Sequence, residues 1–319
     1  MTDIKPKLFI FVEQATHFLR WEIPEFEKYF EVVDTPGTDT ILLSFGPDVI
    51  ERALELPARL KFATTFPGFA HNPLHDLDIR HKHLDILRNF DGVFINPGPL
   101  EIAYSELSNV VFYPFSIDTK LVKFKSYRKK IDSLVHVSND SPQKDWTRSE
   151  EVMKLTGLKY EVFPPRDNSY YESILERNRL KNKIRRKLKL KERNYLPFGY
   201  VPHEIVVKKY QKYDGFVHVA RDIKHPVCID GKFTASLIEA GVTGSILFWH
   251  DTYGLGKGLE TVFDLSLEPE KAAQEILEIS KNIDVYKHSK LTREEMLDTF
   301  STSNSVGIRA NHILKLIDT

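Results

Sequence analysis

The sequence predicts an α/β protein made of two Rossmann-like domains, each with a parallel sheet, whose sheets face one another across a cleft. Three observations lead to this prediction. Short apolar runs alternate with longer amphipathic segments, a pattern typical of parallel strands joined by crossover helices. A polar, basic stretch at 116–132 interrupts the alternation, which then restarts. The chain has 319 residues, enough for two ordinary domain cores.

The first half, 1–125, is expected to form one domain around five strands. Each predicted strand is a short apolar run bounded by turn-forming residues. The strands are predicted at 7–12, 40–45, 60–66, 92–96 and 109–115. Helices are predicted at 47–60 and 78–90, because these segments are longer and amphipathic.

The second half repeats the pattern over a domain expected at 126–285. Its strands are predicted at 133–138, 159–164, 215–220 and 262–266, with a further buried strand directly after Gly244. Its helices are predicted at 147–157, 170–193 and 202–213, near 233–241, and from 268 onward. Residues 286–319 are expected to be a helical tail, and crossing back to the first domain is one course open to it.

The composition excludes several classes of protein. Acidic and basic residues balance at 45 each, so any attraction to nucleic acid or to a membrane must be local. The single cysteine, Cys228, excludes a disulfide framework within the chain and fits a reducing compartment. The apolar run near the N-terminus is too short for a signal segment or a membrane span. We expect a cytoplasmic location, with a peripheral position at the inner face of a membrane as the alternative.

Ligands of open α/β sheets bind beyond the carboxyl ends of the strands, so the loops there hold the candidate site residues. The loop after 133–138 contains Ser138, Asn139 and Lys144, small polar residues and one cation that suit a phosphate. The alternative is a solvated loop that caps the next helix. Tyr200 and Val201, in a turn before Pro202, are candidates to hold a ring, or they form an ordinary turn.

The stretch 230–249 places Glu239 inside a small, apolar, helix-like run. Thr234 or Asp230 can cap this helix, and Gly241 and Gly244 are expected to end it. A carboxylate among apolar neighbours needs a hydrogen-bond partner. One candidate partner is the pair of hydroxyl groups of a ribose. The alternative partner is a lysine or arginine on a helix edge.

Four histidines fall within thirteen positions of the first half, at His71, His75, His81 and His83. No cysteine or HExxH helix accompanies them, so a zinc site is only weakly indicated. His81 and His83 are expected to be solvated on a helix. His71 follows a strand and is the better candidate for contact with a substrate hydroxyl or phosphate.

The segment 177–193 carries ten basic residues, and Leu180, Ile184 and Leu188 recur in it every fourth position. A helix here has one apolar stripe. The stripe is expected to pack on its own domain, with the basic residues solvated. The alternatives are a helix lying on an anionic membrane or one touching nucleic acid.

Four segments in order resemble GT-B-fold glycosyltransferases, and most closely glycosyltransferase family 4. The first resembles the interdomain segment, the second the phosphate loop of the donor domain, the third the nucleobase loop, and the fourth the donor-site helix with its glutamate-alanine pair. These segments are 110–122, 134–146, 198–220 and 230–248. The N-terminal half matches only as a pattern of strands and helices.

The resemblance implies roles for individual residues. Lys144 falls where the family has a lysine for the donor pyrophosphate, and Glu239 where a glutamate holds the ribose hydroxyls. The implied diphosphate ligands are Lys144, Ser138, Asn139, Phe233, Thr234 and Ala235. The implied base contacts are Tyr200 and Val201, and the candidate catalytic residues are His71 and Asp230.

The chain departs from the family pattern at several of these positions. Asn139 stands where many members have an arginine, and Gly231 where they have a first glutamate, with Asp230 one position away. Thr234 replaces a usual glycine, and Pro67 begins the pair that is usually histidine-glycine. These departures motivate an alternative, a non-catalytic GT-B-like partner subunit or sugar-binding protein.

The function implied by the resemblance is transfer of a sugar from a nucleoside-diphosphate sugar to an acceptor hydroxyl, with retention, in glycan or glycoconjugate synthesis. The implied mechanism needs no metal and no cofactor beyond the nucleotide-sugar substrate. The acceptor is expected to be a glycan, a lipid-linked molecule or another hydroxyl compound. Nucleic acid is the least favoured partner, and peripheral membrane contact through 177–193 is the alternative noted above.

Overall fold

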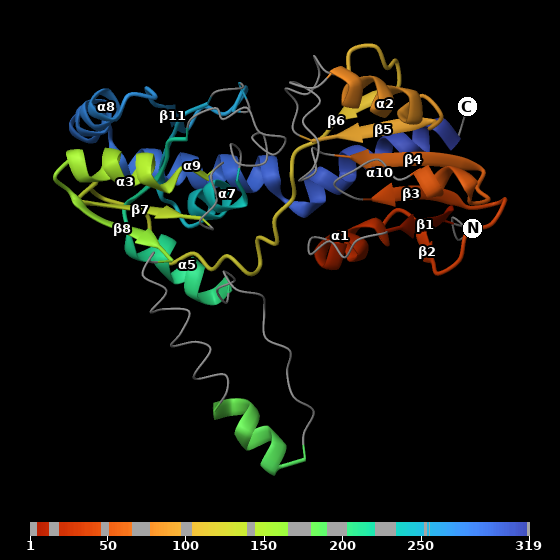
Figure 1. The fold of residues 1–319 in the computed structure, drawn as a ribbon, viewed down its shortest axis with the longest axis horizontal. Coiled ribbons are helices and arrows are strands. Elements are labelled where there is room, and N and C mark those ends of the chain that lie inside the picture. Colours follow the sequence, from red (N-terminus) through yellow and green to blue (C-terminus); the bar gives the residue numbers. More distant parts are fainter. Residues whose placement is uncertain are drawn as a thin grey trace.

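The computed structural model describes residues 5–12, 19–45, 51–65, 77–96, 104–138, 144–164, 180–189, 203–220, 234–251, 254 and 256–317. Within these ranges the chain forms two parallel sheets with helices on both faces, and the two lobes lie side by side (Figure 1). The strands of both sheets point toward the middle of the molecule (Figure 1). The α/β class and the two parallel sheets predicted from the sequence are confirmed.

The first sheet has six strands in the order β2-β1-β3-β4-β5-β6, and every pair is parallel. The strands are β1 (Lys7–Phe11), β2 (Glu31–Val33), β3 (Ile41–Phe45), β4 (Leu60–Thr65), β5 (Gly92–Ile95) and β6 (Val110–Phe112). All five predicted strands are present. The sequence pattern missed β2, because this edge strand has three residues and none of them is fully buried.

The second sheet has five described strands in the order β11-β10-β9-β7-β8, again all parallel. The strands are β7 (Ser133–Val137), β8 (Lys159–Phe163), β9 (Gly215–His218), β10 (Ile246–Trp249) and β11 (Val262–Asp264). The central strands β7, β9 and β10 are buried along their whole length, which is why they read as continuous apolar runs.

Helices cover each sheet from both sides, so each lobe has two cores. On the first sheet, α1 (Leu19–Phe26) and α10 (Thr302–Ile317) pack on one face. The short 3₁₀ helix η1 (Glu51–Glu55) and α2 (Leu77–Leu87) pack on the other. Residues 47–60 were predicted to be one helix, and in the described part only these five residues are helical.

On the second sheet, two helices cover one face and three the other. The first group is α3 (Trp146–Leu155) and α8 (Pro269–Asn282). The second group is α5 (His203–Lys212), α7 (Ala235–Val242) and α9 (Val285–Phe300). Gly241 and Gly244 were predicted to end the helix after Thr234. The helix ends at Val242 with Thr243 as its C-cap, and Gly244 follows with φ +78°, whereas Gly241 is a buried residue of the last turn of α7.

Two segments of the chain pass between the lobes, and they are joined to each other. The segment after β6 runs toward the second sheet, while α9 of the second lobe leads into α10 of the first (Figure 1). Ile117 N–H donates to Phe300 O at 3.1 Å, and Thr302 Oγ1 donates to Ile117 O at 3.2 Å. Because the backbone is paired here, movement of one segment must carry the other.

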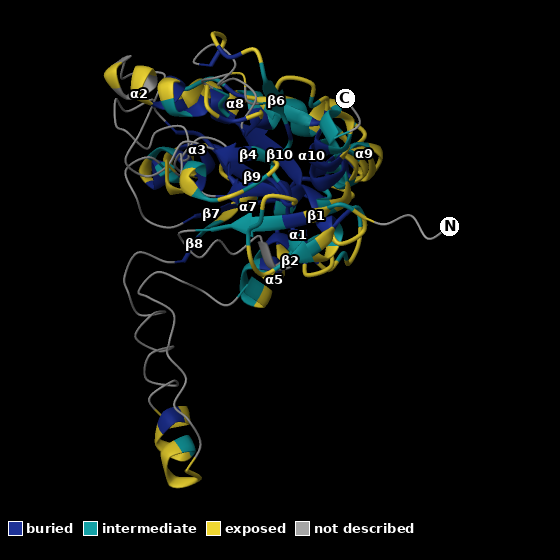
Figure 2. Cartoon of the chain, turned by 90° about the vertical axis from the view of Figure 1, so that its right-hand side faces the viewer, coloured by how far each residue is buried: buried dark blue, intermediate teal, exposed yellow. Residues whose placement is uncertain are grey.

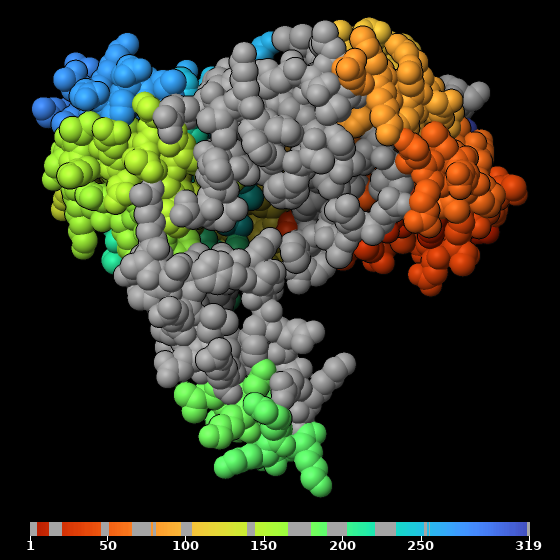
Figure 3. Space-filling view, in the orientation of Figure 1, coloured from red at the N-terminus to blue at the C-terminus, as the bar shows by residue number. Residues whose placement is uncertain are grey.

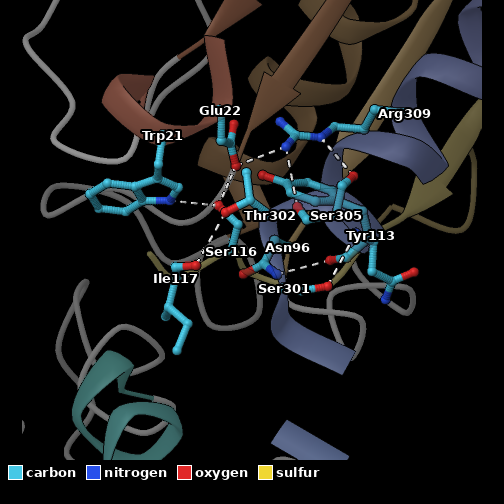
Figure 4. A network of polar contacts seen from close by, with 11 residues as sticks. Trp21, Glu22, Asn96, Tyr113, Ser116, Ile117, Ser301, Thr302, Ser305 and Arg309 are labelled. Carbon is cyan, nitrogen blue, oxygen red and sulfur yellow. Dashed lines mark hydrogen bonds and ion pairs between the residues drawn. The ribbon is translucent and has the colours of Figure 1, made fainter. Parts of the chain in front are cut away.

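A buried polar network lies directly beside this junction (Figure 4). Arg309 of α10 pairs with Glu22 of α1 at 2.8 Å, and Ser116 Oγ donates to the same Glu22 oxygen. Trp21 Nε1 donates to Ser116 Oγ at 3.1 Å, and the Arg309 guanidinium lies 4.4 Å from the centre of the Tyr113 ring. The network therefore connects α1, the crossing segment and α10.

The described helix at 180–187 lies away from both sheets (Figures 1 and 2). The side chains of Leu180, Ile184 and Leu188 are 58%, 54% and 64% exposed. The expectation that this apolar stripe packs on its own domain is therefore wrong. His83 is a second correction, because it is buried near the Tyr104 hydroxyl group whereas His81 is exposed. No helix of the described ranges is long and apolar enough to cross a membrane.

Candidate functional site

The order of the second sheet places its topological switch point between β7 and β9. The chain leaves β7 for β8 on one side, and β9 then pairs with β7 on the other side. In an open parallel sheet the loops after two such strands diverge, and ligands bind between them at the carboxyl edge. The residues that follow β7 and β9 are therefore those that can touch a ligand together.

Two helices begin at this edge from opposite faces of the sheet. Lys144 is half-buried just before α3, and Thr234 directly precedes α7. The Thr234 hydroxyl caps α7 by accepting a hydrogen bond from Leu237 N–H at 3.3 Å, which confirms Thr234 as a cap. The first amides of a helix have no intrahelical partner, so a helix start attracts anions. Ala235 is the first residue of α7 and supplies one such amide.

Ser138 directly follows β7, and its donor groups are already engaged. Its backbone N–H donates to Phe163 O at 3.3 Å. His136 Nδ1 lies 2.8 Å from Val217 O, so this nitrogen carries the proton and Nε2 accepts from the Ser138 hydroxyl at 2.8 Å. Trp146 Nε1 donates to the same hydroxyl oxygen. Ser138 thus positions the loop and α3, and its hydroxyl proton points into the protein.

Glu239 lies on α7 and forms an ion pair with His203, the first residue of α5. His203 Nε2 is 2.7 Å from Glu239 Oε1, and the Glu239 side chain is 16% exposed whereas that of His203 is 39% exposed. The hydrogen bond to Glu239 raises the pKa of His203 above its ordinary value, against the opposing effect of burial. The sequence predicted either a ribose or a lysine or arginine beside Glu239, and the described partner is a histidine.

Tyr210 lies about two helical turns after His203 on the same side of α5, and it is fully buried. Burial raises the pKa of the Tyr210 hydroxyl well above its ordinary value, and the charge of Glu239 raises it further. Tyr210 therefore stays neutral beside the Glu239 carboxylate. The carboxylate is fixed by its own lobe and turned toward the edge where α5 and α7 begin.

Solved structures share the fold of this chain although no sequence comparison identifies a family. A scan of protein-family models and a search of curated proteins find no match. HepE of Anabaena, solved with UDP, superposes with a TM-score of 0.58 at 12% identity, covering 99% of this chain and 100% of that one. AviGT4, a glycosyltransferase involved in avilamycin A biosynthesis, superposes with a TM-score of 0.61 at 11% identity, with 98% of each chain covered.

The chain has the GT-B fold. A variant of TarM of S. aureus, solved with fondaparinux, α-GlcNAc-glycerol and UDP, is a third such neighbour, with a TM-score of 0.57 at 16% identity. The match covers 89% of this chain but 56% of TarM, so the chain spans little more than half of that protein. At these identities the likeness establishes the GT-B fold and leaves the activity to be argued from the site.

Of the predicted site residues, the structure describes five, all on or close to elements of the second lobe: Ser138, Lys144, Thr234, Ala235 and Glu239. The other predicted site residues lie outside the described residues. They are His71, Asn139, Tyr200, Val201, Asp230 and Phe233. In the described part of the chain, no group of three or more His, Cys, Asp or Glu side chains is arranged to hold a metal ion.

His203 is the residue that the sequence interpretation missed. It directly follows Pro202, at the start of a helix whose beginning was already assigned to the base-binding loop. The sequence did offer a signal for His203, because it is a titratable residue at a helix start in a segment that resembles a nucleotide site. Its pairing with Glu239 depends on how α5 packs against α7, which local sequence does not specify.

Proposed function

We propose that this protein is a glycosyltransferase that moves a sugar from a nucleoside-diphosphate sugar to an acceptor hydroxyl. The observation that carries the proposal is Glu239, a largely buried carboxylate paired with His203 on the second lobe of a GT-B fold. Two donor hydroxyls of a ribose match the two oxygens of a carboxylate. The UDP and UDP-glucose bound to HepE favour a uridine donor.

In this proposal the donor occupies the second lobe, at 126–285, and the acceptor the first, at 1–125, with 286–319 as a tail that joins them. Negative charge develops on the diphosphate as it leaves. Lys144 and the first amides of α7 stabilise that charge, because preorganised donors need no rearrangement during the reaction. Transfer proceeds with retention and without a metal or another cofactor.

The remaining predicted residues keep their proposed roles. Tyr200 and Val201 contact the base, and Phe233 adds an amide to those at the start of α7. Asn139 borders the diphosphate, and His71 and Asp230 are the candidate catalytic side chains. Ser138 acts through the position of its loop, since its donors are engaged by Phe163 and His136.

Thermal unfolding against UDP, GDP, ADP, TDP and CMP, with and without magnesium, tests the nucleotide site. A ligand present at one hundred times its dissociation constant adds about 2.7 kcal/mol to the free energy of unfolding. We expect one clear responder, with UDP first, followed by turnover of the matching nucleotide sugar. No response to any nucleotide would remove the proposed donor site.

Variants then locate the site. Glu239→Gln and Lys144→Ala are expected to reduce nucleotide binding and turnover at least about tenfold each, since each removes a charged partner of the ligand. Glu270→Gln and Lys154→Ala are matched controls, because both residues are exposed and lie on α8 and on the far end of α3. Full activity of both site variants would exclude the assignment.

The second candidate function is a non-catalytic GT-B-like partner subunit or sugar-binding protein. It is favoured by the sequence departures at Asn139 and Gly231 and by the engaged donors of Ser138. This candidate predicts no turnover with any nucleotide sugar, even if a nucleotide binds and stabilises the fold. Turnover that depends on Glu239 would decide against it.

A further inference from the structure

The helix at 180–187 presents its apolar side to solvent. Leu180, Ile184 and Leu188 follow one another at every fourth position, so they form one stripe on a helix. The helical bond from Leu188 N–H to Ile184 O, at 3.0 Å, keeps the third member of the stripe in line. All three side chains are more than half exposed. A helix of a soluble domain normally turns such a stripe toward the core.

The polar side of this helix is its less exposed side. Asn182 is 8% exposed and Arg185 is partly buried, and both point away from the stripe at about 100° per residue. Figure 2 shows the helix mostly exposed, with its buried position on one side. The less exposed face of the helix is therefore its polar face, opposite the stripe.

Basic residues surround the stripe. Residues 180–189 contain six lysines and arginines and no acidic residue, although the whole chain carries no net charge. At about 100° per residue, Lys181 and Lys187 flank the stripe on its two sides. Long basic side chains at such positions can bury their stems beside apolar surface while their charged ends reach outward.

The helix is also placed where a broad surface can reach it. It stands clear of the coloured parts of both lobes in the ribbon and in the space-filling view (Figures 1 and 3). Neither sheet therefore covers the stripe.

We propose that the helix at 180–187 binds the surface of an anionic lipid bilayer. The apolar stripe enters the boundary between head groups and acyl chains, while the flanking lysines and arginines contact anionic head groups. Nucleic acid would engage the basic residues and leave three aliphatic side chains exposed. A second copy of the same helix would cover the stripe but would bring six positive charges against six. The inference is independent of the proposed glycosyl transfer.

Vesicle sedimentation of the full chain tests this directly. We expect binding to phosphatidylcholine vesicles that contain phosphatidylserine, weaker binding at high salt, and little binding to phosphatidylcholine alone. The variant Leu180→Ser/Ile184→Ser/Leu188→Ser is expected to lose at least about tenfold in vesicle affinity, because the buried apolar area sets the strength of interfacial binding. The variant Lys181→Gln/Lys187→Gln is expected to lose about fivefold per lysine.

A matched control removes exposed apolar surface elsewhere. Leu155→Ser/Leu291→Ser changes two side chains that are 47% and 44% exposed and lie on α3 and α9. This variant is expected to bind vesicles as the natural chain does. Because the stripe is exposed, the triple serine variant is expected to have the melting temperature of the natural chain. If its melting temperature falls, the single variant Ile184→Ser replaces it in the vesicle experiment.

Three results would overturn the proposal. The first is no binding of the natural chain to anionic vesicles. The second is equal binding of the stripe variant and the natural chain. The third is that the stripe variant binds both a DNA duplex and vesicles as well as the natural chain does. That result would assign the helix to nucleic acid.

Discussion

Arg309 and Glu22 form a buried ion pair in which Arg309 Nη2 lies 2.8 Å from Glu22 Oε1. The two residues come from opposite ends of the chain. Their side chains are 0% and 2% exposed. The pair connects α1, near the start of the chain, with α10, near its end, on one face of the first sheet (Figure 4). The first lobe is therefore complete only when the C-terminal helix has returned to it.

The first prediction concerns this pair. Glu22→Gln is expected to lower the free energy of unfolding by about 3–5 kcal/mol, because it leaves the Arg309 charge buried without its counter-ion. Urea unfolding measures the loss. Glu25→Gln is the control on the same helix, where the partner Lys28 is 63% exposed, so a smaller loss is expected. Equal losses in the two variants would show that burial does not set the energy of the pair.

The second prediction concerns pH and His203. Its pKa is raised in the folded protein, so the folded state binds more protons than the unfolded state. The stabilising contribution is fully present below the unfolded pKa of about 6.5 and is lost as the pH rises through the folded pKa. The destabilisation caused by His203→Gln is therefore expected to be largest at acidic pH and to fade toward alkaline pH in urea unfolding.

His288 supplies a control of opposite sign. Burial lowers its pKa, so the unfolded state binds more protons and stability rises with pH up to about 6.5. His288→Gln is expected to remove that rise, whereas His203→Gln removes a decline at higher pH. The same pH dependence in both variants would contradict the assignment of the His203 shift to Glu239.

The strands of the fold were predictable because burial of both sheet faces leaves continuous apolar runs, as in β10. Two short elements were not. The strand β2 has only three residues, and α1 carries Pro24 in its interior, so neither gives a clear periodic signal. The C-terminal tail was predicted as helical with its course left open, because packing of Val306, Ala310 and Ile313 against the first sheet is a long-range contact.

In the candidate site too, local signals were predictable and long-range contacts were not. Glu239 and Thr234 were identifiable because a charged residue in an apolar helix and a hydroxyl before it are local signals. The engagement of the Ser138 hydroxyl by His136 and Trp146 was not, since it depends on contacts made across β7 and α3. His203 belongs to the second group for the same reason.

The third prediction concerns the packing of α7, the helix that carries Glu239. A methyl group added at Gly241 would lie 2.5 Å from Met296 Cγ of α9, closer than such atoms can approach. Gly241→Ala is expected to cost about 1–3 kcal/mol through overpacking, as measured by thermal or urea unfolding. It should also weaken nucleotide binding by shifting Glu239.

Gly307→Ala is the matched control in α10. A methyl group there would meet only Tyr29 Oη, at 3.4 Å, and alanine favours a helix over glycine by up to about 1 kcal/mol. We expect no loss, or a small gain, in stability. A loss at Gly307 as large as that at Gly241 would mean that helix packing is not what distinguishes the two positions.

The fourth prediction concerns Arg128, a buried cation in the segment that enters the second lobe. Its guanidinium donates to three carbonyl oxygens, those of Tyr213 at 2.9 Å, Ser126 at 2.8 Å and Tyr210 at 2.6 Å. Burial lowers its pKa, and Asp214 opposes that effect. The planar fork of an arginine can reach three acceptors at once, and a lysine ammonium on a flexible stem cannot reproduce that geometry.

Arg128→Lys is therefore expected to destabilise the second lobe by about 2–3 kcal/mol, since hydrogen bonds from a charged donor are lost and buried carbonyls are left unpaired. Urea unfolding followed by tryptophan fluorescence measures the change, with the exposed neighbour Lys129→Ala as the control. Because Tyr210 lies on α5 with His203, the variant should also loosen the pair between His203 and Glu239. Unchanged stability in Arg128→Lys would show that positive charge alone, without the arginine geometry, holds this junction.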